Sequence, residues 1–134
     1  MANGNTAIIE EFRSNSCKVG GIFEGDPMLI LHNTGAKSGA VRLNPLLYRR
    51  EGDRVFVFAS KGGAPQNPDW YHNVMASPSV TVEIGSDTIS ATATEVTGSE
   101  RDEIYARQAA ADARFDTYQK ATDRTIPVIE LIAG

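Results

Sequence analysis

The sequence predicts a single-domain, mainly β (α+β) protein in which antiparallel strands close into a small barrel with short peripheral helices. Apolar stretches of strand length recur along the chain and are joined by glycine-bearing turns. They lie at residues 28–33, 41–50, 54–60, 80–84, 88–96 and 126–132. The helical stretches are short and do not alternate with the strands, which disfavours a parallel α/β sheet. With 134 residues, the chain can build one core but not two.

The composition is that of an ordinary soluble globular protein, with 41% hydrophobic and 22% charged residues. The single cysteine, Cys17, excludes an internal disulfide and cannot by itself form a zinc site. His32 and His72 are too far apart in sequence to show metal-ligand spacing. The first residues carry no basic n-region, and no apolar run approaches the ~20 residues of a membrane span. We therefore expect a cytoplasmic protein without a metal.

Residues 1–27 are expected to form a helix and a loop ahead of the barrel core, which spans residues 28–132. The helix is expected at residues 6–16, because a polar residue at its start can cap it and its apolar side chains fall on one face. The glycines and the proline of residues 19–27 forbid regular structure there.

A proline inside the second strand predicts a departure from a regular central strand. Pro45 has no N–H to give to a ladder, so residues 41–50 are expected to form an edge, a bulge or a bend there. A bend would turn Arg42 and Asn44 toward the preceding glycine-bearing turn. Residues 51–53 (Glu-Gly-Asp) then form a hairpin turn, and the strand that follows alternates valine with phenylalanine on its two faces.

Capping signals place two helices in the second half of the chain. Asn67 suits an N-cap and the proline after it suits the first helical turn, so residues 68–76 are expected to be helical. A Thr-Gly-Ser-Glu capping box opens a second helix, over residues 97–113. Between the helices, a hairpin is expected around residues 85–87. The polar and aromatic residues 114–124 can form a short helix or a loop.

Two glycine-bearing turns at strand ends share the same chemistry. Residues 34–39 (Thr-Gly-Ala-Lys-Ser-Gly) combine glycines, hydroxyls and a lysine, and residues 60–63 (Ser-Lys-Gly-Gly) repeat this combination. Glycine allows backbone N–H groups to approach a ligand closely, while hydroxyls and lysine supply further donors. The two turns therefore look like the two sides of an anion site. The alternative, a solvated hairpin with ordinary turn residues, stays open.

The charge distribution supports a specific anionic ligand. Between Gly35 and Lys61 there are six basic and two acidic side chains, a local net charge of +4, whereas the whole chain carries −4. A basic stretch in an acidic chain favours a defined anion over a bulk polyanion such as nucleic acid.

Common nucleophile and nucleotide motifs are missing from the sequence. There is no Gly-x-Ser-x-Gly elbow, Cys17 has no nearby histidine, and Lys37 lacks the preceding glycine of a phosphate-binding P-loop. Neighbouring carboxylates such as Glu10 and Glu11 are best interpreted as solvated helix surface. If the protein is an enzyme, its demanding chemistry must therefore come from a bound organic cofactor.

Two aromatic groups are candidate walls for a ligand. Trp70 and Tyr71 follow a helix start and can either pack in the core or lie against a flat, conjugated ring. Tyr105, Phe115 and Tyr118 are separated by polar residues, a pattern that suits an exposed substrate pocket better than a buried core.

Four motifs occur in order along the chain. They cover residues 34–46 (Thr-Gly-x-Lys-Ser-Gly-x-x-Arg-x-Asn-Pro-Leu), 59–63 (Ala-Ser-Lys-Gly-Gly), 67–71 (Asn-Pro-x-Trp-Tyr) and 122–127 (Thr-Asp-Arg-Thr-Ile-Pro). Together, over about residues 28–132, they resemble the deazaflavin-dependent nitroreductase family of actinobacteria. The resemblance implies a split β-barrel, FMN-binding-like in its fold. It also implies coenzyme F420, an 8-hydroxy-5-deazaflavin whose tail carries a phosphate and several glutamates.

The resemblance further implies which residues hold the coenzyme. Its anionic tail would meet basic and hydroxyl side chains and glycine N–H groups, at Lys37, Ser38, Gly39, Arg42, Lys61, Gly62 and Gly63. The deazaflavin ring would lie along the strand edge, at Asn44, Pro45, Leu46, Ala59 and Ser60, with Trp70 and Tyr71 near the ring or the tail. Arg49 and Arg50 are expected to face solvent.

The implied reaction is hydride transfer from C5 of the reduced coenzyme to an activated C=C bond or to a nitro or quinone-type acceptor, followed by protonation. Ser60 and Tyr118 are the candidate catalytic residues, and Phe115 with Tyr118 would line the substrate pocket. Phe115 and Ala121 stand where bulkier or hydroxylated aromatic residues occur in the nitroimidazole-activating member. This departure indicates a roomier pocket and a different acceptor.

Two other functions stay open at this point, namely an FMN-dependent oxidoreductase on the same barrel and a non-catalytic protein that carries F420. FMN has one phosphate and no polyglutamate tail, so a broad basic groove favours the deazaflavin. The expected partners are a small-molecule hydride acceptor and a second copy of the chain, without nucleic acid or an integral membrane segment. The N-terminal helix is the one element expected to touch a membrane surface in relatives, although residues 6–16 are too polar here for a convincing anchor.

Overall fold

The computed structural model describes residues 28–36, 38–85 and 87–133. Its strands are β1 (Met28–Thr34), β2 (Val41–Glu51), β3 (Arg54–Phe58), β4 (Ser79–Ile84), β5 (Asp87–Val96) and β6 (Val128–Ala133). Its helices are the 3-10 turn η2 (Lys61–Gly63), α2 (Asp69–Ala76), α3 (Gly98–Ala111) and α4 (Ala113–Lys120). The expected N-terminal helix and loop lie outside the described residues.

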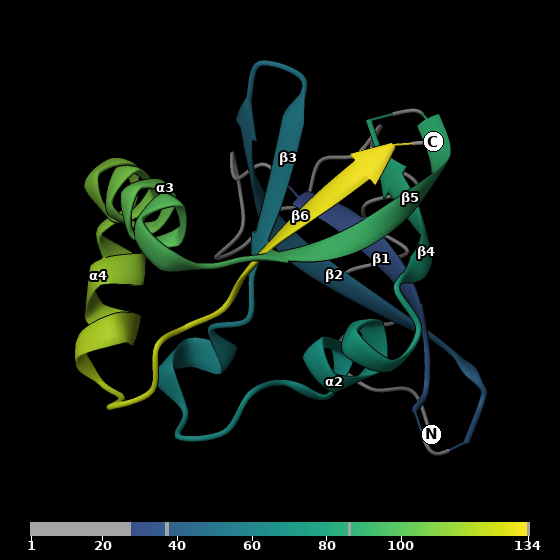
Figure 1. Ribbon diagram of the computed structural model, residues 1–134, viewed down its shortest axis with the longest axis horizontal. Coiled ribbons are helices and arrows are strands. Elements are labelled where there is room, and N and C mark those ends of the chain that lie inside the picture. Colours follow the sequence, from purple (N-terminus) through teal and green to yellow (C-terminus); the bar gives the residue numbers. More distant parts are fainter. Residues whose placement is uncertain (1–27, 37, 86, 134) are drawn as a thin grey trace.

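The strands close into an antiparallel barrel in the order β1-β2-β3-β6-β5-β4 (Figure 1). Both expected hairpins are present, because Glu51 pairs with Arg54 and Ile84 pairs with Asp87. The predicted barrel is therefore confirmed, together with its short peripheral helices. A closed barrel satisfies the hydrogen bonds of strands that would otherwise be edges.

Pro45 lies at an open edge within the barrel wall. Residues 41–47 of β2 pair with β1, with Pro45 opposite Ile30, whereas residues 48–51 pair with β3. Among the described strands, the first part of β2 therefore has a neighbour on one side only. Because no described strand pairs with this part of β2 on its other side, the missing N–H of Pro45 interrupts no hydrogen-bond ladder there. Of the three expected alternatives, the edge is the one observed.

Two apolar cores lie on opposite faces of β3. Val57 belongs to the core that fills the barrel interior, and Val55 packs against it. Phe56 and Phe58 belong to a second core between the barrel wall and helices α3 and α4. The predicted alternation of valine and phenylalanine is thus confirmed. Both faces are buried, because α3 and α4 cover the outer one (Figure 1).

The helices begin close to the expected residues, but without the expected side-chain caps. Pro68 occupies the N-cap position of α2, and Asn67 does not cap the helix. The Oδ1 atom of Asn67 instead accepts a hydrogen bond of 2.7 Å from Nη1 of Arg124. Thr97 occupies the N-cap position of α3, again without a side-chain cap bond. The capping role expected for Asn67 is therefore wrong, because its side-chain oxygen accepts a hydrogen bond from the half-buried guanidinium of Arg124 instead.

Candidate functional site

Both glycine-bearing turns lie at one end of the barrel. The loop between β1 and β2, the turn at η2 and helix α2 all lie at the end opposite the β2–β3 hairpin (Figure 1). Strands β1 and β3 deliver the two turns to this end, and α2 follows the second turn along the chain. Most of the elements that carry predicted site residues thus lie at the same end of the barrel (Figure 1).

The β1–β2 loop is a closed backbone turn. The N–H of Gly35 donates to the carbonyl of Ala40 at 2.8 Å, and the N–H of Gly39 donates to the carbonyl of Gly35 at 2.9 Å. The Ser38 hydroxyl accepts a 3.2 Å hydrogen bond from the N–H of Ala40. Gly39 has a φ of +71°, a value that favours glycine, and no atom lies within 4 Å of the place a Cβ would take. Lys37 lies outside the described residues.

A chain of amide side chains holds this loop against the barrel. The N–H of Ala36 donates to Oδ1 of Asn73 on α2 at 2.9 Å, and Nδ2 of Asn73 donates to Oδ1 of Asn33 at 2.8 Å. Nδ2 of Asn33 in turn donates to Oδ1 of Asn44 on β2 at 2.9 Å. Asn33 is only 1% exposed, so this polar chain is part of the core. This chain of hydrogen bonds joins Asn44, which is predicted to contact the deazaflavin ring, to the β1–β2 loop, which is predicted to contact the coenzyme tail.

Asn33 and Asn73 are absent from the predicted site. A signal for Asn33 exists in the sequence, since it is a polar residue at an inward position of β1, in phase with Leu29 and Leu31. A buried amide at such a position must find partners, because an unsatisfied one is costly. Nothing comparable marks Asn73, whose role depends on where α2 docks.

Fewer basic side chains are free for a ligand than the charge count indicates. Arg49 donates from Nε to Oε2 of Glu51 at 2.6 Å, and Arg54 forms a two-bond pair with Glu130. Arg49 is half-buried, so the expectation that it faces solvent is wrong, while Arg50 is exposed as expected. Three other members of the basic set are exposed and form no ion pair with any described residue; they are Arg42, Arg50 and Lys61.

The second glycine-bearing turn rests directly on helix α4. The N–H of Gly63 donates to the carbonyl of Ser60 at 2.9 Å, which closes the turn. Gly63 has a φ of +84°, and a Cβ on it would lie 2.8 Å from the carbonyl oxygen of Tyr118 and 2.9 Å from Cβ of Ala121. Glycine is therefore required here twice, for its backbone angle and for the contact. This contact brings the turn of Ser60 next to the backbone of Tyr118.

Arg124 donates hydrogen bonds to backbone carbonyls on both sides of the same turn. Its guanidinium donates to the carbonyl of Ala59 at 3.1 Å, to that of Ser60 at 2.8 Å and to that of Ala64 at 2.9 Å. The bond to Asn67 is a fourth. Arg124 lies within a motif visible in the sequence, but it is not among the predicted site residues, because its partners are carbonyls that no sequence pattern reveals.

Trp70 and Tyr71 have different surroundings. Trp70 is 4% exposed and packs in the interior core, which agrees with the core alternative. Tyr71 is half-buried, and its hydroxyl donates to Oε1 of Glu95 at 2.7 Å. Burial, together with this carboxylate, raises the pKa of Tyr71 to about 12, so the phenol stays protonated at neutral pH.

The second aromatic group is less exposed than expected. Tyr105 is 5% exposed and Phe115 is 2% exposed, and both belong to the core that includes Phe58. The expectation that these two side chains are exposed is wrong. Phe115 and Tyr118, three residues apart, place their rings in edge contact at 5.5 Å, and the other residues of α4 stay polar. Tyr118 is half-buried and is the member of this group nearest the surface.

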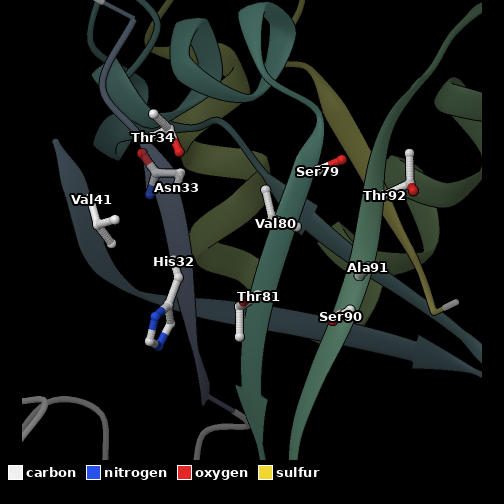
Figure 2. A pocket seen from close by; sticks show the side chains of 10 residues that line it. All are labelled: His32, Asn33, Thr34, Val41, Ser79, Val80, Thr81, Ser90, Ala91 and Thr92. Atoms are coloured by element: carbon white, nitrogen blue, oxygen red, sulfur yellow. The ribbon is translucent and has the colours of Figure 1, made fainter. Parts of the chain in front are cut away.

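A separate hollow of about 450 Å³ lies on the outer face of β1, β4 and β5 (Figure 2). It is lined by His32, Asn33, Thr34, Val41, Ser79, Val80, Thr81, Ser90, Ala91 and Thr92. Most of the side chains that point outward here are hydroxyls, and His32 lies with Nε2 2.5 Å from Oε2 of Glu83. The residues that line this hollow are not those of the predicted site.

Among the described residues, no three His, Cys, Asp or Glu side chains gather in a way that could hold a metal ion. No helix in this part of the chain is long and apolar enough to cross a membrane.

Comparison with known proteins shows the family. Residues 6–132 match the F420H(2)-dependent quinone reductase family. The chain belongs to this family. A quinone reductase of this kind from Mycobacterium tuberculosis H37Rv is 37% identical over 124 residues, which cover 90% of this chain and 83% of the relative. A second, putative one from the same strain is 39% identical over 105 residues, covering 78% of this chain and 88% of the relative.

Solved structures agree with this assignment. The structure of an F420-H2 dependent reductase is 40% identical, with a TM-score of 0.71, and the match covers 78% of this chain and 93% of the other. A structure described as a domain-swapped dimer is 35% identical, with a TM-score of 0.72, and the match covers 94% and 98%. The haem storage protein HutZ from Vibrio cholerae shares the fold alone, at 14% identity and a TM-score of 0.64 over 97% of this chain and 90% of HutZ. The predicted family and fold are both confirmed.

Proposed function

We propose that this protein is an F420H2-dependent oxidoreductase that transfers a hydride to a small-molecule acceptor, with quinones as the leading acceptor class. The observation that carries the proposal is the family match over residues 6–132. Bound at the end of the barrel described above, reduced F420 supplies the hydride that no side chain of the protein can supply. The protein's own residues bind the coenzyme, orient the acceptor and provide hydrogen bonds.

The donors at this end of the barrel suit an anionic tail. Arg42 and Lys61 are exposed and form no ion pair with a described residue, so both are available to carboxylates or a phosphate. The space around the Cα of Gly39 is open, which allows a ligand to reach the backbone there. These features support Ser38, Gly39, Arg42 and Lys61 as tail contacts, with Lys37 and Gly62 as further candidates from the motifs.

The open edge of β2 suits the flat ring. Asn44, Pro45 and Leu46 all lie in the part of β2 that pairs with β1 only, and each is half-buried. The amide of Asn44 is already fixed by its hydrogen bond to Asn33, so a ligand meets a side chain with little freedom left to lose. These observations support a ring site between this edge and the segment that begins at Ala59.

Ser60 and Tyr118 are the proposed hydrogen-bond donors to the acceptor. Ser60 begins the η2 turn, and the turn packs on the backbone of Tyr118 through Gly63. A half-buried hydroxyl can polarise an acceptor carbonyl and pass a proton to it after hydride transfer. Phe115 would act behind Tyr118, because its own ring is buried. Trp70 would support the site from the core, and Tyr71 would lie beside it.

Further features of the protein remain part of this proposal. We infer one domain, in which residues 28–132 form the barrel core and residues 1–27 precede it. We also infer a homodimer, since the relative with 35% identity is described as a domain-swapped dimer. We infer a cytoplasmic location from the sequence, in which the first residues carry no basic n-region and no apolar run reaches the length of a membrane span.

Fluorescence titration with oxidised F420 and with FMN tests the cofactor. We expect tight binding of F420 and negligible binding of FMN, followed by oxidation of F420H2 when a quinone such as menadione is added. Preferred binding of FMN would contradict the proposed cofactor. Binding of F420 without turnover on quinones, enones or nitro compounds would instead indicate a carrier of the coenzyme.

A pair of charge variants tests the tail site. Arg42→Ala and Lys61→Ala should each weaken F420 binding about 5-fold to 100-fold, because each removes a charge-assisted hydrogen bond to the tail. The losses should be larger at low salt. Arg50→Ala is the matched control, since Arg50 is also exposed and unpaired among the described residues but lies near the other end of the barrel. Equal losses in all three variants would show that the tail is held elsewhere.

A further inference from the structure

Arg124 is a charged side chain whose recorded hydrogen bonds all go to uncharged groups. Among the described residues, no carboxylate forms an ion pair with it, and its bonds go to three backbone carbonyls and one amide oxygen. Arg124 is half-buried, and withdrawing a guanidinium from water is costly unless the surrounding groups compensate it.

Four of the five N–H donors of this guanidinium are committed to one loop. Nε donates to the Ala64 carbonyl, Nη1 to the Ala59 carbonyl and to Asn67 Oδ1, and Nη2 to the Ser60 carbonyl. The acceptors lie 57 to 65 residues away in sequence, at both ends of the segment that carries the second glycine-bearing turn. One rigid, planar group therefore fixes where that segment leaves β3 and where it enters α2.

The backbone of the segment needs such support. Lys61 has a φ of +47°, which is uncommon for a residue other than glycine, and Gly63 follows at +84°. A non-glycine residue in the left-handed region is strained and persists only where its surroundings impose this conformation. The hydrogen bonds from Arg124 to the carbonyls of Ala59 and Ser60 stabilise this backbone conformation at the start of the turn. The packing of Gly63 on α4 stabilises it at the end.

We propose that Arg124 is a positioning residue of the coenzyme site, whose guanidinium fixes the conformation of the Ser60–Gly63 turn and thereby the placement of the ligand contacts that the turn carries. The proposal rests on the proposed function insofar as the ligand is F420. The claim that Arg124 fixes the conformation of the turn does not depend on which ligand binds. Arg124 touches neither coenzyme nor acceptor in this scheme and acts through the carbonyls of the turn.

Arg101 provides a matched control. It is also an arginine that bonds to a carbonyl, since Nε and Nη2 donate to the Ile126 carbonyl at 3.0 and 2.8 Å, and Nη2 also donates to Oε1 of Gln119 at 2.7 Å. Its side chain is 11% exposed. Arg101 anchors the segment that precedes β6, but makes no hydrogen bond to residues 59–67. The variant Arg101→Gln therefore measures how much stability is lost when a largely buried arginine near residues 122–127 is removed without any change in bonding to residues 59–67.

The test compares Arg124→Gln, Arg124→Lys and Arg101→Gln in the full chain. We expect both glutamine variants to lose thermal stability. Only Arg124→Gln should accelerate amide hydrogen exchange in residues 59–64 and raise both the Kd of F420 and the KM of F420H2 at least about tenfold. Arg124→Lys should recover part of the affinity, because an ammonium can still donate to some of the carbonyls. It also serves as the informative variant if Arg124→Gln fails to fold.

Two results would overturn the proposal. One is unchanged exchange and unchanged coenzyme affinity in both Arg124 variants. The other is an equal loss of affinity in Arg101→Gln, which would make the effect a general consequence of lower stability. If the unmutated protein binds no F420, the proposed function fails and the coenzyme role fails with it. The exchange data then still decide whether Arg124 fixes the turn.

Discussion

Replacing Gly63 by alanine tests the contact between the second glycine-bearing turn and α4. The new methyl group would lie 2.8 Å from the Tyr118 carbonyl oxygen and 2.9 Å from Cβ of Ala121, both closer than a Cβ can approach. The left-handed backbone at φ +84° adds about 1–2 kcal/mol for any residue with a Cβ. Relief of the close contacts adds about 1–3 kcal/mol. We therefore expect Gly63→Ala to lower the free energy of unfolding by about 2–5 kcal/mol.

Gly52→Ala is the matched control for this experiment. Gly52 lies in the β2–β3 hairpin with a φ of +62°, and nothing lies within 4 Å of the place its Cβ would take. Gly52→Ala therefore incurs the backbone cost alone, about 1–2 kcal/mol. Urea denaturation followed by circular dichroism measures both variants, and F420 titration then shows whether the displaced turn has lost affinity. A loss in Gly63→Ala no larger than in Gly52→Ala would refute the close packing of the turn on α4.

Three further predictions concern buried polar groups and surface charges. Asn33→Leu should lower the free energy of unfolding by about 2–3 kcal/mol in urea denaturation, because its amide partners are left buried without a hydrogen bond. Tyr105→Phe should cost about 1 kcal/mol at neutral pH through its lost bond to the Phe115 carbonyl. Because burial raises the pKa of Tyr105 to about 12 from 10.0, the unmutated protein should lose stability as pH rises from 10 to 12, and this loss should shrink in the variant. A hydrogen bond from Arg107 lowers the pKa of Glu51 to about 2 from 4.5, so the stability that this pair contributes should be lost as pH falls from 4.5 toward 2. Arg107→Met should flatten that acid limb in thermal melts at a series of pH values, and an unchanged limb would show that the pair contributes nothing.

The barrel could be predicted because its strands are marked locally. Apolar runs with β-branched residues and glycine turns identify β1 to β6, and the hairpins follow from the short turns between them. The prediction for Phe115 failed for a reason that is also local. A short helix such as α4 buries only one narrow face, so a single apolar residue among polar ones can be fully buried while the pattern still suggests exposure.

The candidate site could be predicted only where a residue's own chemistry indicates its role. Glycine, lysine and serine in the two turns, with Arg42 shortly after the first, are visible as an anion-binding pattern. Arg124, Asn33 and Asn73 were missed because their partners are backbone groups and amides on distant segments, and tertiary structure alone brings these together. The charge count likewise overestimated the number of basic side chains available to a ligand. Arg49 and Arg54 form ion pairs with carboxylates that the folded chain brings next to them.

Pro45 has a consequence for how the protein behaves without a ligand. Among the described strands, the first part of β2 has a neighbour on one side only, and such an edge is a template on which a strand of another molecule can pair. Proline presents no N–H to an incoming strand and so interrupts the ladder that it would need. Pro45 therefore disfavours the pairing of another chain along this edge, which should lower the tendency of the protein to aggregate through it.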